Sequence, residues 1–215
     1  TLGITPKLQN QYGGGYSQEF TKVNIEGKEF LVPDYSADES WGPKLDGTEV
    51  LHWDAFDPED TENYLKPRPW VYPKNDYRSF FNTGVTWTNS IALAKSYENT
   101  SARLSASNVT QSGIVPNSKL KRSTVALSLD NKFSEKLTAR GTINYIRTNG
   151  FNRPEQGYGD NSIGQKMFQW GQTQLDYERL KNYKTSKGNQ KSWNIKSWDD
   201  PTPNYSDNHY WSSSE

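Results

Sequence analysis

An all-β fold with antiparallel sheets is expected for this chain of 215 residues. Between Gly84 and Arg147, four short runs alternate apolar and polar residues with a period of two, which is typical of strands with one apolar face. The connections at 95–99 and 131–136 are short and polar, whereas the connection at 109–122 is long. Short turns at one end and longer loops at the other are typical of outer-membrane barrels, although a soluble β-sandwich or a water-facing meander also alternates.

The four runs sort their residues by face. The expected apolar face carries no charged residue within the runs, and it comprises Val85, Trp87, Ile91 and Leu93, then Ala102, Leu104 and Ala106, then Val125, Leu127 and Leu129, and finally Leu137, Ala139, Gly141, Ile143 and Tyr145. Arg103 and Arg140 fall on the opposite face, where a water-filled lumen would accept them. Runs 84–94 and 137–147 have the roughly 9–11 residues that a tilted membrane strand needs. Near the run ends lie aromatic residues, as an interfacial girdle requires: Trp87, Tyr97, Phe133 and Tyr145.

Composition excludes several classes of protein. The 25 basic and 25 acidic residues balance, so the chain lacks the positive footprint of a nucleic-acid-binding protein. The absence of cysteine excludes disulfides, thiolate metal sites and cysteine nucleophiles. A hydrophobic content of 32% is low for a domain with its own core, while an aromatic content of 13% speaks against disorder. Together with a mean hydropathy of −0.99, this mixture fits strands with one wet face joined by polar, aromatic-rich loops, and we expect a fragment of a larger protein.

Residues 1–83 are expected to form a long loop region after an early strand that ends near Leu2 and Ile4. The three glycines at 13–15 predict a flexible loop. The segment 19–32 predicts a hairpin with its turn at Glu26-Gly27. Segment 40–47 predicts a compact turn anchored by burial of Trp41, and Trp41, Lys44 and Asp46 are candidate substrate or partner contacts.

Two short helices are expected before the meander. Asp57 and Pro58 have the residue types of a helix start, which predicts a helix to about Leu65. Asp76 is expected to cap a single helical turn that reaches Phe81. The acidic run 54–62 does not have the spacing of a calcium-binding loop.

Residues 148–215 are expected to form a second loop region with short helices at 163–171 and 175–183. Its aromatic residues stand among amides and carboxylates, a mixture that either binds sugars or peptides or holds a long loop together. The candidates for substrate or partner contact in this region are Trp170, Trp193, Trp198, Tyr205 and Trp211. His52 and His209 lie far apart in sequence and have no evident partners for a metal site or a catalytic triad, and we expect no cofactor.

Several segments resemble the SusC/RagA-type TonB-dependent outer-membrane transporters. The strand segments that carry the resemblance are FFNTGVTWTNSIAL, TSARLSASN, QSGIVPNSKLKRSTVALSLD and FSEKLTARGTINYI. The loop segments are PKLQNQYGGG, SWGPKLDG, FQWGQTQLDYERLKNY and DNHYW. Together they span nearly the whole chain.

This resemblance implies a large antiparallel transmembrane β-barrel of about 22 strands with a plugged lumen, long extracellular loops and short helical insertions. It implies a protein of the outer membrane that is surrounded by lipid, imports oligosaccharides or peptides, is not an enzyme, and is capped outside by a SusD-like lipoprotein. The plug and the motif that contacts the TonB energy-coupling complex are missing from these residues, so the chain corresponds to an early barrel segment, 84–147, with its loops. Two alternatives remain: a soluble aromatic-rich β-protein that binds glycans at the cell surface, and a β-rich glycoside hydrolase using acids such as Asp46 and Asp54.

Overall fold

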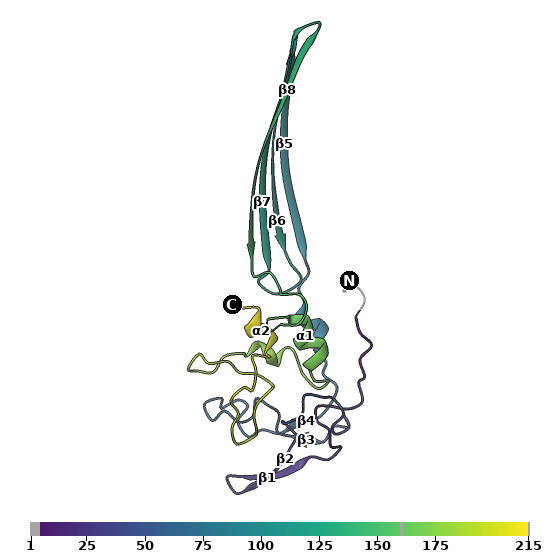
Figure 1. The fold of residues 1–215 in the computed structure, drawn as a ribbon. Helices are drawn as coiled ribbons and strands as arrows, with labels where there is room; N and C mark the ends of the chain where they lie inside the picture. The colour runs from purple at the N-terminus through teal and green to yellow at the C-terminus, as the bar shows by residue number, and fades with distance from the viewer. Residues whose placement is uncertain (1–4, 160, 215) are drawn as a thin grey trace. The chain divides into compact units, whose positions relative to one another are not determined.

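The computed structural model describes residues 5–159 and 161–214, which form antiparallel sheets with a few short helices (Figure 1). The expected all-β character is therefore confirmed. The chain divides into a sheet unit, residues 82–153, and a loop unit that joins residues up to 81 with those from 154 onward. Leu2 and Ile4 lie outside the described residues. Among the described helices, none is long and apolar enough to cross a membrane.

The sheet unit is the expected antiparallel meander. Its strands are β5 (Val85–Tyr97), β6 (Thr100–Ser112), β7 (Lys119–Ser134) and β8 (Leu137–Phe151), paired in that order. Each strand extends beyond its apolar run because ladder pairing continues through polar residues, as in the pairs Thr110↔Lys121 and Ser112↔Lys119. Backbone hydrogen bonding does not depend on side-chain polarity, so the apolar pattern marks less than the full strand.

The connections differ less in length than the sequence predicts. Two-residue turns, 98–99 and 135–136, join the outer pairs of strands, and the loop between β6 and β7 spans only 113–118. The long loop predicted at 109–122 is therefore wrong in extent. Gly113 N donates to Ser118 O at 2.8 Å, which closes this loop close to the strand ends. The asymmetry between the two ends of the sheet persists in weaker form.

The loop unit is built around short strands and a small core. β1 (Thr21–Ile25) and β2 (Lys28–Val32) form the predicted hairpin around Glu26-Gly27, and β3 (Glu49–Val50) pairs with β4 (Arg68–Pro69). The hairpin packs on segments from both halves of the unit. Its core cluster consists of Val23, Val32, Leu51, Ala55, Phe56 and Ile195.

Most short helices of the loop unit agree with expectation. η1 (Tyr77–Phe80) is a 3₁₀ turn capped by Asp76, whose Oδ1 accepts from Arg78 N at 3.0 Å. α1 (Ile163–Gln165) continues into the π-helical turn η2 (Lys166–Trp170), within the predicted helix. η3 (Arg179–Lys181) occupies only one turn of the second predicted helix, and α2 (His209–Ser212) follows near the end.

The helix predicted from Asp57 to Leu65 is wrong, because this segment forms consecutive turns. The Asp60 carboxylate accepts from the side-chain amide of Asn63 at 2.9 Å and from Lys191 Nζ at 2.7 Å. Leu65 adopts a left-handed φ of 50°. Asp and Asn side chains that bond locally compete with helical hydrogen bonding, which explains the outcome.

The glycines at 13–15 are buried rather than in a flexible loop, so that prediction is also wrong. Gly13 N donates to Pro43 O, and Gly42 N donates to Gly13 O, both at 3.0 Å. A Cβ on Gly13 would lie 2.3 Å from the ring of Trp70, so the close approach requires glycine. Trp70 is 1% exposed and donates from Nε1 to Pro43 O at 3.1 Å. It therefore anchors this region, whereas Trp41, the predicted anchor, is 60% exposed.

Candidate functional site

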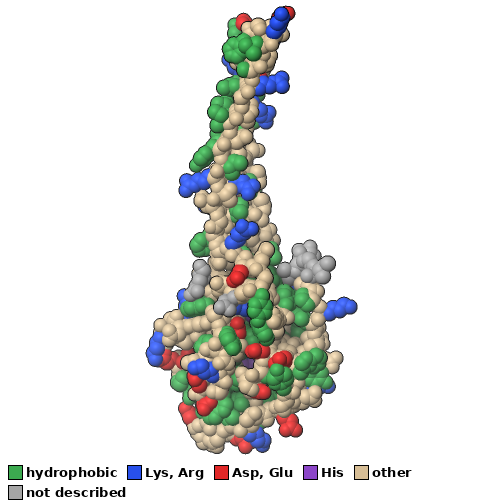
Figure 2. All heavy atoms as spheres, in the orientation of Figure 1, with side chains coloured by type: hydrophobic (Ala, Val, Ile, Leu, Met, Phe, Trp, Pro, Cys, Tyr) green, Lys and Arg blue, Asp and Glu red, His purple; other side chains and the backbone are tan. Residues whose placement is uncertain are grey.

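One face of the four-stranded sheet is apolar across all of its strands. In one row Leu93, Leu104, Leu127 and Ile143 are direct neighbours, and in the next row Ile91, Ala106, Val125 and Tyr145 are. We use the name apolar band for one part of this face. It runs from Ile91 to Tyr97 on β5, crosses the paired residues of β6 and β7, and runs from Leu137 to Tyr145 on β8. Figure 2 shows hydrophobic side chains gathered along one side of the sheet.

The apolar band is exposed. Leu93 and Ile143 retain 64% and 69% of their accessible surface. Contiguous exposed apolar surface of this kind marks an interaction site, because water solvates it poorly. Both outer strands, β5 and β8, also leave one edge unpaired among the described residues. One face of the sheet is thus exposed and apolar, and both of its edges are open to pairing among the described residues.

The opposite face of the sheet is polar. Arg103 lies directly across from Ser128, and Arg140 pairs with Asp130 at 2.8 Å between Nε and Oδ1. Ser128 Oγ lies 3.3 Å from Thr142 Oγ1. Both arginines predicted to face a lumen thus lie on one water-compatible face, although an ion pair this exposed contributes little stability.

The face that bears the apolar band carries charged residues once the full strands are considered. The expectation that this face is uncharged, which came from the shorter runs, is therefore wrong. Lys95 on β5 lies in the apolar band, in the edge strand. Lys119, Lys121 and Arg147 lie on the same face but beyond the band, since period-two alternation continues past Val125 and Tyr145.

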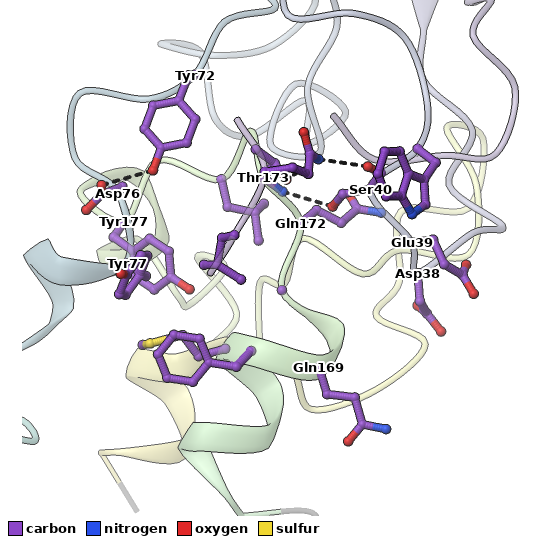
Figure 3. Close-up of a pocket in the computed structure, with 17 residues that line it drawn as sticks. Asp38, Glu39, Ser40, Tyr72, Asp76, Tyr77, Gln169, Gln172, Thr173 and Tyr177 are labelled. Carbon is purple, nitrogen blue, oxygen red and sulfur yellow. Dashed lines mark hydrogen bonds between the residues drawn. The ribbon is translucent and has the colours of Figure 1, made fainter. Parts of the chain in front are cut away.

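A pocket of about 260 Å³ in the loop unit combines aromatic rings with amides and carboxylates (Figure 3). Its aromatic lining comes from Trp41, Tyr72, Tyr77, Phe168 and Tyr177, and its polar lining includes Gln9, Asp38, Glu39, Gln169 and Gln172. We call it the Trp41 pocket. A concave site with aromatic walls and a few convergent polar groups is typical of small-ligand sites.

Long-range hydrogen bonds hold the wall of the Trp41 pocket. Gln9 Nε2 donates to Ser40 O at 2.8 Å and to Thr173 Oγ1 at 2.9 Å, and Thr173 N donates to Ser40 Oγ at 3.1 Å. Tyr72 OH donates to Asp76 at 3.0 Å, and Figure 3 shows this pair beside the cavity. The hydrogen bond from the Arg78 guanidinium keeps the pKa of Asp76 below its usual value, so this carboxylate is ionised at neutral pH.

A second pocket of about 420 Å³ shares Asp38 with the first. Trp170, Tyr205 and Tyr158 line it, so two of the predicted contact residues are brought together here. Burial raises the pKa of Asp38, although its hydrogen bond from Asn194 Nδ2 at 3.1 Å acts in the opposite direction. One carboxyl group thus borders two aromatic-lined cavities.

The other predicted contact residues lie outside both pockets. Asp46 accepts a hydrogen bond from Thr48 Oγ1 at 2.8 Å, in a turn that comes directly after Lys44 and Leu45 in the chain. Trp193 is buried, Trp198 packs against the core cluster, and Trp211 lies half-buried with its ring centroid 6.3 Å from that of Tyr183. All three tryptophans thus make packing contacts within the loop unit.

Sequence reasoning missed the pocket residues Tyr72, Phe168 and Gln172 as candidates. Two signals could have identified them: the proline-bounded aromatic segment around Trp70 and Tyr72, and the amide-rich segment that follows Phe168. Neither segment is near Trp41 in sequence, so the grouping depends on the fold.

The two acids considered for hydrolysis lack the raised pKa that a general acid needs. Burial alone would raise the pKa of Asp54, but Arg68 and Arg179 outweigh burial and hold it below its usual value. Their guanidinium groups lie 2.5 and 2.6 Å from its carboxylate oxygens. The hydrogen bond from the Thr48 hydroxyl lowers the pKa of Asp46.

No group of three or more His, Asp or Glu among the described residues has metal-ligand geometry. No family model matches this chain, and no curated protein matches it.

Proposed function

We propose that this chain is an early barrel segment of an outer-membrane, TonB-dependent importer of the SusC/RagA type. In this proposal lipid covers the apolar band, and the polar face with Arg103 and Arg140 lines a water-filled lumen. The observation that carries it is an exposed apolar band opposite a polar face, on a sheet whose two edges have no strand partner among the described residues. Barrel closure would pair those edges, and lipid would remove the band from water.

The dimensions of the apolar band support this proposal. On β8 the band runs from Leu137 to Tyr145, which is about 26 Å along a strand at about 3.3 Å per residue. A tilt of about 40° reduces this to roughly 20 Å across the membrane, against about 25 Å for the apolar belt of a barrel. Aromatic side chains close the band at both ends, with Tyr97 beside the short turns and Tyr145 at the other end. The short turns would be periplasmic and the 113–118 loop extracellular.

The loop unit supplies the substrate contact in this proposal. The Trp41 pocket and its neighbour would bind an oligosaccharide or peptide, with aromatic faces packing on apolar surface and amides donating hydrogen bonds. A SusD-like lipoprotein would cap this unit, and energy from TonB would enter through a plug and coupling motif that are not among these residues. These partners rest on the sequence resemblance alone.

Cysteine scanning tests the lipid assignment directly, because the chain has no cysteine of its own. Single cysteines at residues 123–131 of β7 would carry spin labels in lipid vesicles. Labels at Val125, Leu127 and Leu129 should be relaxed by lipid-soluble oxygen, and labels at Ala126 and Ser128 by a water-soluble nickel complex. Loss of this two-residue alternation, or immobilised odd-numbered labels that do not respond to oxygen, would instead indicate a protein-covered sheet.

The Trp41 pocket favours a second candidate, a soluble glycan-binding protein at the cell surface. Trp41 is exposed at 60%, so truncating it to alanine should weaken glycan binding without loss of stability. Glycan titration of the native chain and of the Trp41→Ala variant, together with membrane fractionation, separates the two. Trp41-dependent binding by a chain that never associates with membranes would favour the soluble protein.

A further inference from the structure

The face of the sheet that bears the apolar band becomes basic beyond the band. Two residues past Tyr145 on β8 comes Arg147, and four and six residues before Val125 on β7 come Lys121 and Lys119. Period-two alternation places all three on the face of Leu127 and Ile143. We call Lys119, Lys121 and Arg147 the basic patch.

The basic patch contains no compensating acid. The other residues of this face beyond the band are uncharged: Val85, Trp87, Asn89, Asn108, Thr110, Ser112, Ser123, Asn149 and Phe151. Among the ion pairs of the described residues, none involves the three cations of the patch. The whole chain has a formal charge of zero, so three cations on one small surface are a local concentration of charge.

The geometry points to a binding surface for anionic lipid headgroups, with phosphate as the group that is bound, and we propose it as such. This inference rests on the proposed membrane position of the apolar band. With a strand tilt of about 40° and a rise of about 3.3 Å per residue, Arg147 lies about 5 Å and Lys121 about 10 Å in depth beyond the band. The headgroup layer adds roughly 5–8 Å on each side of the hydrocarbon core. The flexible stems of these side chains span the remaining distance.

The spacing within the patch suits phosphate. Lys121 and Arg147 are diagonal neighbours on adjacent strands, which places them roughly 7–8 Å apart at the backbone, so both side chains can reach one phosphate group. The arginine guanidinium can bind two phosphate oxygens at once. Trp87 lies in the same cross-strand row as Lys121 and is 65% exposed, as an aromatic residue at a membrane interface would be.

Charge on the opposite face offers a matched control. Arg103, Arg122 and Lys132 belong to the polar face, where Arg122 Nε donates to Thr148 Oγ1 at 3.3 Å. Replacing these three removes the same positive charge as replacing the basic patch. The two sets therefore separate a located headgroup site from attraction by net charge alone.

Vesicle binding of the full chain tests the inference. The chain would be mixed at low ionic strength with phosphatidylcholine vesicles and with vesicles that also contain phosphatidic acid, and binding would be followed by co-sedimentation. A cation near an anionic membrane surface strengthens binding about fivefold, so the three together should give a preference on the order of a hundredfold for the anionic vesicles. The preference should fall as salt is raised, and inorganic phosphate at constant ionic strength should not displace the chain.

The triple variant Lys119→Gln, Lys121→Gln, Arg147→Gln should lose nearly all of this preference while still binding phosphatidylcholine. The variant Arg103→Gln, Arg122→Gln, Lys132→Gln should keep most of it. Equal binding of the native chain to both kinds of vesicle, or equal loss in both variants, would overturn the headgroup site alone. Displacement by inorganic phosphate would show that the patch takes the free anion instead, and binding to neither kind of vesicle would overturn the membrane proposal as well.

Discussion

Leu127→Arg tests the lipid-facing assignment most sharply, because the neighbours of Leu127 in the chain point to the other face. Leu127 lies between Leu104 and Ile143 within the apolar band. Ser128 lies on the polar face, opposite Arg103 and beside Thr142. A shift of one residue along β7 thus exchanges a proposed lipid environment for a proposed aqueous lumen.

The magnitude follows from the depth of Leu127. On β8 the centre of the band is Gly141, which pairs with Leu129, and Leu127 lies two residues from Leu129. That separation is about 7 Å along the strand and about 5 Å in depth at a tilt of about 40°. Arginine costs about 2–4 kcal/mol on the lipid face at the midplane and about 0–1 kcal/mol near the interfaces. We therefore expect Leu127→Arg to cost about 2 kcal/mol, a roughly thirtyfold change in the folding equilibrium.

The matched variant Ser128→Arg should cost less. It places a like charge opposite Arg103, which opposes folding by up to about 1 kcal/mol, while Asp130 on the same face offsets part of this cost. Ala126→Arg is a second control on the polar face, because its direct partners, Ser105 and Asn144, are uncharged.

Urea-dependent folding into vesicles of different hydrocarbon thickness is the measurement. The Leu127→Arg penalty should change with bilayer thickness, since depth sets its cost, whereas the penalties of both controls should not. If all three variants lose equal stability, or if Ser128→Arg is the most damaging, the register or the membrane assignment is wrong.

Three further predictions concern the loop unit. Gly42→Ala should destabilise it by about 1–3 kcal/mol in chemical denaturation, because a Cβ there would lie 2.1 Å from Gly14 O. The control Gly164→Ala should be neutral or stabilising, because its Cβ would meet no atom within 4 Å. Asp54→Asn should cost about 3–5 kcal/mol, since it leaves two partly buried guanidinium groups without their carboxylate, and an unchanged urea midpoint would contradict this account. Burial lowers the pKa of His209 from 6.5 to about 3, helped by the charge of a neighbouring lysine. The unfolded state therefore binds more protons between these values, and stability present above pH 6.5 should fall by about 1.4 kcal/mol per pH unit toward pH 3. Burial also lowers the pKa of His52, to about 4, so thermal melts of His209→Gln should show a slope that is smaller by this amount but not abolished.

Local patterns in the sequence determined the antiparallel meander, its two faces and several turns. Alternation with a period of two assigned Leu127 and Arg103 to opposite faces, because successive side chains on a strand must point to opposite sides. The Glu26-Gly27 turn and the Asp76 cap were also predictable, since each depends on a few neighbouring residues. The resemblance to outer-membrane transporters likewise arises from the sequence, and it remains a proposal.

Tertiary structure decided what depends on residues far apart in the chain. β7 begins at Lys119 and includes Lys121, both paired with β6, because backbone pairing continues where the apolar pattern stops. Trp70 is buried because glycine at position 13 lets its ring approach the backbone, a contact that no local pattern encodes. The Trp41 pocket likewise joins distant segments, as the hydrogen bond from Gln9 to Thr173 in its wall shows. Periodicity and capping act over a few residues, whereas burial and close approach are set by the packing of distant segments.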